Sequence, residues 1–80
     1  MTSKADISDW LEQAKSKNAT HMIVVCDTYD WDDYPVFVSP NQDVRQVESQ
    51  YSRDMQKVME IYRLDMDWAA QLSQPRARNY

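Results

Sequence analysis

Residues 20–39, THMIVVCDTYDWDDYPVFVS, decide the fold. Two apolar runs, at residues 22–26 and 36–38, flank a short segment rich in Asp, Tyr and Trp. Apolar, β-branched runs separated by a few polar residues are typical of a β-hairpin. We therefore predict strands at about residues 20–28 and 35–39. Pro35 cannot donate a backbone hydrogen bond, so we expect it at the start of its strand or on an edge of the sheet.

The first predicted strand is apolar on both faces. Strand alternation places His21, Ile23, Val25 and Asp27 on one face. The other face receives Met22, Val24, Cys26 and Thr28. Because the middle of each face is apolar, we expect the strand to be buried on both sides, with helices or a second copy of the chain covering the sheet.

Helical periodicity surrounds the hairpin. A helix over about residues 6–17 is predicted by an apolar stripe with i, i+3, i+4, i+7 spacing, formed by Ile7, Trp10, Leu11 and Ala14. Ser3 or Asp6 can cap its start, and Asn18 can end it because asparagine tolerates the left-handed conformation. Further stripes predict helices at about residues 43–52, 54–63 and 66–73, followed by a tail at residues 75–80. The spacing leaves open whether residues 43–63 form one helix or two.

Chain length limits the fold to a single domain over residues 1–80. The predicted order α-β-β-α-α(-α) indicates an α+β class, in which a short antiparallel hairpin packs with helices. Two strands make a marginal sheet, and small domains commonly gain burial by self-association. We therefore expect a homodimer, with strand pairing across the interface as one arrangement.

Composition argues against most enzymatic chemistry. The chain has no glycine, which excludes glycine-rich phosphate loops and dinucleotide fingerprints. One cysteine and one histidine exclude an intramolecular disulfide and Cys₂His₂ zinc sites. His21 and Cys26 stand five residues apart on one predicted strand, so they lie on opposite faces and cannot act as a base–nucleophile pair. We expect no catalytic activity and no cofactor.

The net charge of −4 is concentrated in one region. Residues 20–43 hold five carboxylates and no Lys or Arg. Nucleic-acid binding needs positive charge, so we do not expect it at the hairpin. No apolar run reaches the roughly 20 residues of a membrane span, and no apolar signal core follows the start of the chain. Together with the single cysteine, this predicts a small acidic cytoplasmic protein without membrane contact.

The segment between the two strands is the candidate binding site. Residues 27–34 combine carboxylates with aromatic rings, and Tyr and Trp dominate the binding energy of protein interfaces. Carboxylates steer a basic partner surface toward such anchors. We therefore predict a non-catalytic interaction protein that binds a basic protein partner through this loop. The predicted contact residues are Tyr29, Asp30, Trp31, Asp32, Asp33 and Tyr34.

Two alternative binding functions stay open, and the first uses the carboxylates of the same loop. Clustered carboxylates are ligands for hard cations, so a divalent-cation or small cationic-ligand site at Asp27, Asp30, Asp32 and Asp33 is the first alternative. The spacing is not that of a calcium loop, which needs a glycine and a distant Glu. The second alternative is a nucleotide-binding sponge that uses helix arginines across a dimer, namely Arg45, Arg53 and Arg63.

Methionines and a tryptophan in the last third of the chain would be able to line a ligand-binding site. A helically spaced apolar set is more typical of a core. We therefore expect core positions for Met55, Met59, Met66 and Trp68.

Several segments resemble a group of small uncharacterised proteins from bacteria and phages. The resemblance is carried by ATHMIVVCDTYD at residues 19–30, DYPVFV at 33–38, DVR at 43–45, DMQKVME at 54–60 and the terminal Tyr80. It implies a stand-alone domain and a phage or mobile-element origin, and it implies no activity or cofactor. With such an origin, inhibition or regulation of a host protein is the expected role.

Overall fold

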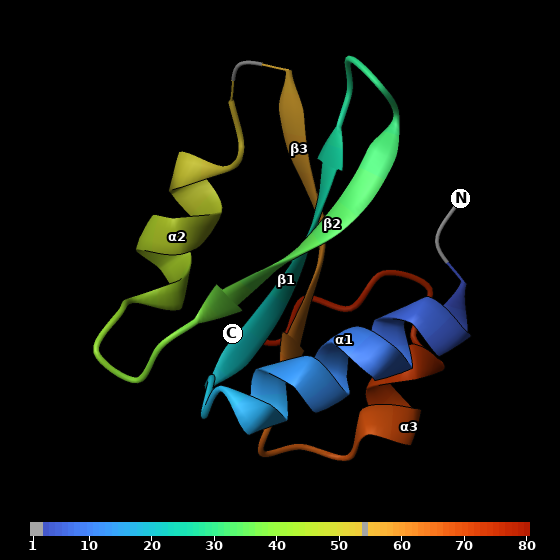
Figure 1. The fold of residues 1–80 in the computed structure, drawn as a ribbon, viewed down its shortest axis with the longest axis vertical. Helices are drawn as coiled ribbons and strands as arrows, with labels where there is room; N and C mark the ends of the chain where they lie inside the picture. Colours follow the sequence, from blue (N-terminus) through green and yellow to red (C-terminus); the bar gives the residue numbers. More distant parts are fainter. Residues whose placement is uncertain (1–2, 54) are drawn as a thin grey trace.

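The computed structural model describes residues 3–53 and 55–80. Along the chain run α1 (Lys4–Ser16), β1 (His21–Asp27), β2 (Asp32–Val38), α2 (Val44–Gln50), β3 (Gln56–Arg63) and α3 (Trp68–Leu72), as Figure 1 shows. Asp54, predicted to begin a helix and part of the family resemblance, lies outside the described residues, as do residues 1 and 2. Within those described ranges, no helix has the length and apolar character needed to cross a bilayer.

The three strands form one antiparallel sheet in the order β2-β1-β3. This confirms the α+β class and the predicted hairpin, and it adds a third strand. The central strand β1 pairs with β2 from His21↔Val38 to Asp27↔Asp32. On its other side it pairs with β3, beginning at His21↔Arg63. Pro35 lies on the edge strand β2, as the sequence predicts.

The predicted helix over residues 54–63 is wrong, because this segment forms β3. A β-bulge explains the error. Val24 pairs with Glu60 but Val25 pairs with Val58, so Met59 is an extra residue in the strand. The extra residue shifts the alternation, which places Val58 and Ile61 in one core and packs Met59 and Tyr62 against the other. Each pair is three residues apart, and this spacing imitates a helix.

Capping hydrogen bonds define both ends of α1. Ser3 Oγ accepts a hydrogen bond from the Asp6 N–H at 3.2 Å, and Asp6 Oδ2 accepts one from the Ser3 N–H at 3.2 Å. At the other end, Asn18 takes the predicted left-handed conformation with φ 56°. The Ala19 N–H then donates to the Ala14 carbonyl at 2.9 Å, which satisfies one of the last helical acceptors.

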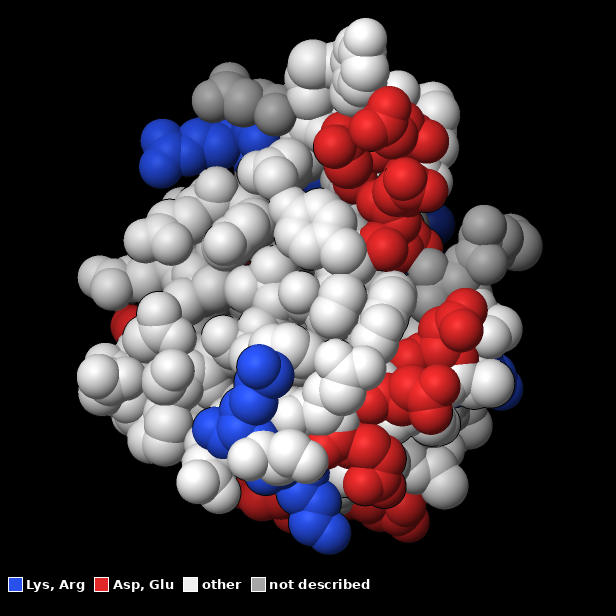
Figure 2. All heavy atoms as spheres, viewed as in Figure 1, with Lys and Arg blue, Asp and Glu red and all other residues white. Residues whose placement is uncertain are grey.

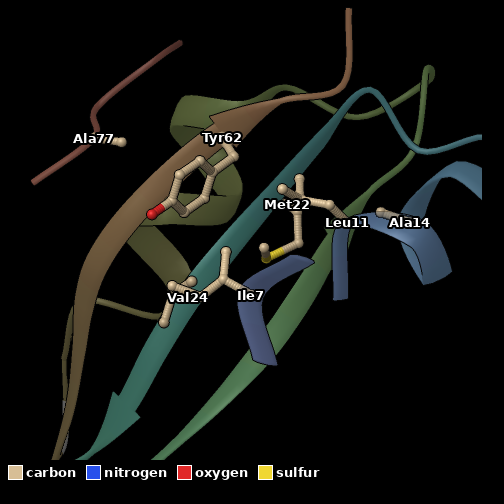
Figure 3. Close-up of a cluster of buried hydrophobic side chains, with 7 residues drawn as sticks. All are labelled: Ile7, Leu11, Ala14, Met22, Val24, Tyr62 and Ala77. Atoms are coloured by element: carbon tan, nitrogen blue, oxygen red, sulfur yellow. The ribbon is translucent and has the colours of Figure 1, made fainter. Parts of the chain in front are cut away.

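Both faces of β1 are buried, as predicted. We call the first cluster the α1-side core; it contains Ile7, Leu11, Ala14, Met22, Val24, Tyr62 and Ala77 (Figure 3). The second cluster, the α2-side core, contains Ile23, Val25, Val38, Val47, Val58 and Ile61. Met59 and Trp68 pack against the α1-side core. Met55 and Met66 are exposed, so the prediction of core positions is wrong for these two methionines.

Candidate interaction surface at the hairpin tip

The loop between β1 and β2 spans residues 28–31 and is shorter than the predicted contact segment 27–34. Asp32, Asp33 and Tyr34 belong to β2. The Asp27 side chain shapes the turn, since its Oδ1 accepts a hydrogen bond from the Tyr29 N–H at 2.9 Å. This loop therefore depends on backbone and Asp27 contacts, and its aromatic side chains are left for the surface.

Trp31 has an unusual backbone conformation. Its φ is 59°, in the left-handed region that glycine and asparagine normally occupy. A bulky residue there costs about 1–2 kcal/mol, because Cβ crowds the following carbonyl. The residue is 73% exposed, so burial within this chain does not offset that cost. The fold alone therefore gives no reason for tryptophan at this position.

Met55 joins the same end of the sheet. It also has a positive φ, 66°, and it is 57% exposed. Its carbonyl accepts a hydrogen bond from the Thr28 N–H at 2.8 Å, which ties the start of β3 to the hairpin loop. The sequence pattern gives no sign of this contact, because it depends on the register of a strand that resembles a helix.

Three of the four large hydrophobic side chains that are exposed in the described chain gather at this end. We call Tyr29, Trp31 and Met55 the tip surface. The fourth, Met66, precedes α3 and is 41% exposed. Figure 1 shows the β1–β2 loop and the beginning of β3 at the same end of the sheet. Large exposed apolar groups that cluster in this way mark interaction sites.

Negative charge lies beside the tip surface. Asp30 and Asp32 are exposed, and residues 20–43 contain no Lys or Arg. Figure 2 shows acidic side chains gathered in a band that starts near the hairpin end and continues along the side where α1 lies. Asp33 is partly buried, and burial together with a hydrogen bond to Asp33 raises the pKa of the Cys26 thiol.

Tyr34 turns inward and does not belong to the exposed surface. It packs against the α2-side core. Its hydroxyl accepts a hydrogen bond from Gln56 Nε2 at 2.5 Å. Burial, followed by the negative potential of neighbouring groups, raises the pKa of Tyr34. Of the six predicted contact residues, Tyr29, Asp30, Trp31 and Asp32 are therefore the ones that face solvent freely.

The four aspartates of the predicted cation site are not gathered around one point. Asp27 shapes the turn and Asp33 contacts Cys26, while Asp30 and Asp32 face solvent. Across residues 3–53 and 55–80, no three His, Cys, Asp or Glu side chains are placed to hold one metal ion. The arrangement therefore gives the cation-site alternative no support.

The three arginines of the predicted nucleotide-binding alternative have different surroundings. The Arg45 guanidinium lies 4.1 Å from the centre of the Tyr80 ring. Arg63 makes two hydrogen bonds to Asp65, at 2.9 and 2.8 Å, and these lower the pKa of the Asp65 carboxyl. Arg53 is exposed beyond the end of α2. These three side chains do not converge within one chain.

A cavity of about 610 Å³ lies at the opposite end of the sheet, where β1 begins and β3 ends. His21 lines it, and His21 Nδ1 lies 2.9 Å from Thr20 Oγ1. Cys26 is at the other end of β1, so these two residues are not brought together. A smaller cavity of about 260 Å³ is lined by residues that include Lys4, Glu60 and Tyr62.

Comparison of the chain with protein-family models, with curated proteins and with solved structures finds no match. The resemblance of residues 19–30 and 33–38 to small bacterial and phage proteins therefore stays a prediction. A functional conclusion for this chain rests on the geometry of its own tip surface.

Proposed function

We propose that this chain is a non-catalytic binding protein whose hairpin tip contacts a protein partner with a basic surface. The observation that carries the proposal is Trp31, which is both exposed and held in a left-handed backbone conformation. Backbone strain of this kind concentrates at functional sites, where the surrounding structure holds it in place. Trp31 weakens the fold and packs against neither core. Contact with another molecule would explain why a tryptophan is present at this position.

The shape of the tip favours a macromolecular partner over a small ligand. Tyr29 and Trp31 on the hairpin loop and Met55 just before β3 are exposed at one end of the sheet, while the cavities of about 610 and 260 Å³ are lined by other residues. Small ligands bind in concave sites that enclose most of their surface. A protruding aromatic group instead fills a pocket on its partner, as interface anchors do.

The charge next to the tip specifies the chemistry of the partner. Asp30 and Asp32 are exposed beside Trp31. Charges at an interface rim accelerate association and exclude partners of like charge. We infer a partner with an apolar pocket for Trp31 and with Lys or Arg side chains around it.

Affinity capture from the native host tests the proposal. The three baits are the native chain, Trp31→Gly and Met66→Ala, the last being a matched change at an exposed hydrophobic residue outside the tip surface. We expect a protein that is retained by the native chain and by Met66→Ala and lost with Trp31→Gly. If all three baits retain the protein equally, the tip surface is not the binding site.

Inhibition of a host protein is a narrower form of this proposal, and it comes from the resemblance to phage and bacterial proteins. Expression of the chain in a host that carries the captured partner should impair that partner's activity. Trp31→Gly should relieve the impairment at the same expression level. If the native chain and Trp31→Gly impair the partner's activity equally, the inhibition does not depend on binding through the tip surface.

A further inference from the structure

The larger cavity lies at the end of the sheet opposite the tip surface. Three segments meet around its volume of about 610 Å³: residues 19–21 where β1 begins, residues 40–44 ahead of α2, and residues 63–65 where β3 ends. Figure 1 shows the beginning of β1 and the end of β3 at this same end of the sheet. A volume of this size is typical of sites for small molecules, which span about 300–1,000 Å³.

Hydrogen bonds fix the backbone around the cavity. The Thr20 N–H donates to the Val38 carbonyl at 2.8 Å, and the Leu64 N–H donates to the Thr20 carbonyl at 3.1 Å. The side-chain amide of the fully buried Gln71 holds Arg63. Its Oε1 accepts from the Arg63 N–H at 2.8 Å, and its Nε2 donates to the Arg63 carbonyl at 2.9 Å. The cavity is therefore largely pre-formed, which lowers the ordering cost of binding a ligand.

Asp43 gives the cavity an excess of negative charge. Three charged side chains line the cavity, and two of them, Arg63 and Asp65, pair with each other at 2.8 Å. The third, Asp43, is exposed and forms no ion pair with any described residue. Its Oδ1 accepts a hydrogen bond from the Arg45 N–H at 3.0 Å and caps α2. The charge of this carboxylate is therefore left for a cationic ligand.

His21 adds an unused hydrogen-bonding atom to the lining of the cavity. Its Nδ1 lies 2.9 Å from Thr20 Oγ1, and the Thr20 hydroxyl donates to the Val38 carbonyl at 3.3 Å. With the hydroxyl proton on that carbonyl, Oγ1 accepts from the His21 Nδ1–H, and Nε2 of the neutral ring is an acceptor. This nitrogen is buried, and no described residue bonds it. Because buried polar atoms rarely lack partners, this lining favours a ligand that brings hydrogen-bond donors.

Carbon surface lies beside these polar groups. Val44 and Leu64 line the cavity and are half-buried, and Pro40 lines it at an exposed position. A ligand with a carbon skeleton removes such surface from water on binding. A bare metal ion does not, and no three His, Cys, Asp or Glu side chains in the described ranges are placed to hold one. The lining therefore combines one unpaired carboxylate with apolar contacts.

We propose that this cavity binds a small organic amine, whose ammonium group pairs with Asp43 and whose carbon skeleton packs on Val44 and Leu64. An ammonium group supplies three N–H donors and one positive charge, and hydrogen bonds between ions are the strong ones. An organic anion is disfavoured, because Asp65 already occupies the Arg63 guanidinium and Asp43 repels a second carboxylate. This site is separate from the tip surface and does not rest on the proposed partner.

Titration with 2-phenylethylamine, followed by nuclear magnetic resonance, tests the inference. His21 is the only histidine of the chain, so its ring protons report unambiguously on the cavity. The matched probes 2-phenylethanol and 3-phenylpropionate replace the ammonium group by a hydroxyl and by a carboxylate. We expect saturable shifts with the amine, at least threefold weaker binding of the alcohol and no binding of the acid. Failure of the amine to bind, or equal binding of all three probes, would overturn the proposal.

A pair of matched variants locates the ammonium group. Asp43 and Asp67 are both helix N-caps that accept from the N–H two residues on at 3.0 Å, and of the two Asp43 lines the cavity. Asparagine caps helices as well as aspartate does, so Asp43→Asn and Asp67→Asn each remove one charge and keep the fold. We expect Asp43→Asn to raise the Kd of the amine at least threefold, with Asp67→Asn unchanged. Equal effects of the two variants would assign the binding to net charge and refute the site.

The tip variant Trp31→Gly separates this inference from the proposed function. It should bind the amine with native affinity, because Trp31 does not line the cavity. A loss of amine binding in a folded Trp31→Gly chain would contradict a site at the His21 end of the sheet.

Discussion

The backbone N–H of Trp31 donates to the carbonyl of Asp27 at 2.6 Å and closes the hairpin loop. This bond uses backbone atoms alone. The turn is completed by the Asp27 side chain, which accepts from the Tyr29 N–H. The indole of Trp31 therefore plays no part in forming the loop. Its replacement should preserve the hairpin, which makes it possible to separate folding from binding at this residue.

Replacement of Trp31 by glycine should stabilise the fold. Relief of the left-handed strain gains about 1–2 kcal/mol, and the extra unfolded-state freedom of glycine costs about 0.5–1 kcal/mol. We expect a net increase of roughly 0.5–1 kcal/mol in the free energy of unfolding, measured by urea denaturation. Trp31→Ala keeps Cβ and should show no such gain. A less stable Trp31→Gly chain would show that the indole supports the fold.

Neutralising the acidic rim should slow association with the partner. Asp30→Asn/Asp32→Asn removes two exposed charges beside the tip surface. Because rim charges act on the encounter, we expect about a tenfold lower association rate constant at low salt and a small change in dissociation. Asp9→Asn/Glu12→Gln removes the same charge from exposed positions on α1 and serves as the control. Equal slowing by both pairs would assign the effect to net charge.

Removal of the Gln71 amide should destabilise the protein strongly. Gln71→Ala leaves the N–H and the carbonyl of Arg63 without these partners at a part-buried site. An unsatisfied buried polar group costs about 1–3 kcal/mol. We expect a loss of at least about 2 kcal/mol in urea denaturation, against less than about 0.5 kcal/mol for Gln13→Ala on the exposed side of α1. Similar stabilities for the two variants would contradict the role of Gln71 at the β3 edge.

Alkaline pH should unfold the protein partly through Tyr62. Burial, and then the hydrogen bond to Glu60 at 2.8 Å, raises the pKa of Tyr62 above its ordinary value of 10.0. The folded state holds this proton more tightly than the unfolded state. The resulting stability is complete below pH 10 and is lost progressively as the pH rises above 10.

The free energy of unfolding should therefore fall as the pH rises above 10. The slope of this fall gives the number of protons released on unfolding, and Tyr62→Phe should reduce that number by close to one. Some slope should remain, because the pKa values of Tyr34 and Tyr80 are raised as well. Urea denaturation between about pH 8 and 11 measures the slope. Identical slopes for the two chains would show that Tyr62 ionises equally in both states.

The sequence predicts those parts of the fold that local rules control. Alternation in residues 21–27 reveals a strand buried on both faces, and the polar stop at Asn18 correctly ends α1. The third strand is missed because the bulge at Met59 gives it a helical spacing. The docking of residues 77–80 depends on hydrogen bonds between distant segments, for which composition carries no signal.

Only those parts of the candidate site that depend on local sequence could be predicted. Tyr29 and Trp31 follow from the hairpin pattern alone. Met55 joins them through a backbone bond to Thr28, and Tyr34 leaves the surface because strand alternation turns it toward the α2-side core. Both facts require the register of the three strands. The left-handed conformation of Trp31 likewise depends on the length of the loop.

The most direct test is the affinity of the purified partner for the native chain, Trp31→Gly and Met66→Ala, measured by titration calorimetry. The loss of an interface anchor costs about 2 kcal/mol or more, which is roughly a 30-fold increase in Kd. We predict that increase for Trp31→Gly in a chain that is at least as stable as the native one, with Met66→Ala unchanged. A stable Trp31→Gly chain that binds the partner with native affinity would contradict tip-mediated recognition.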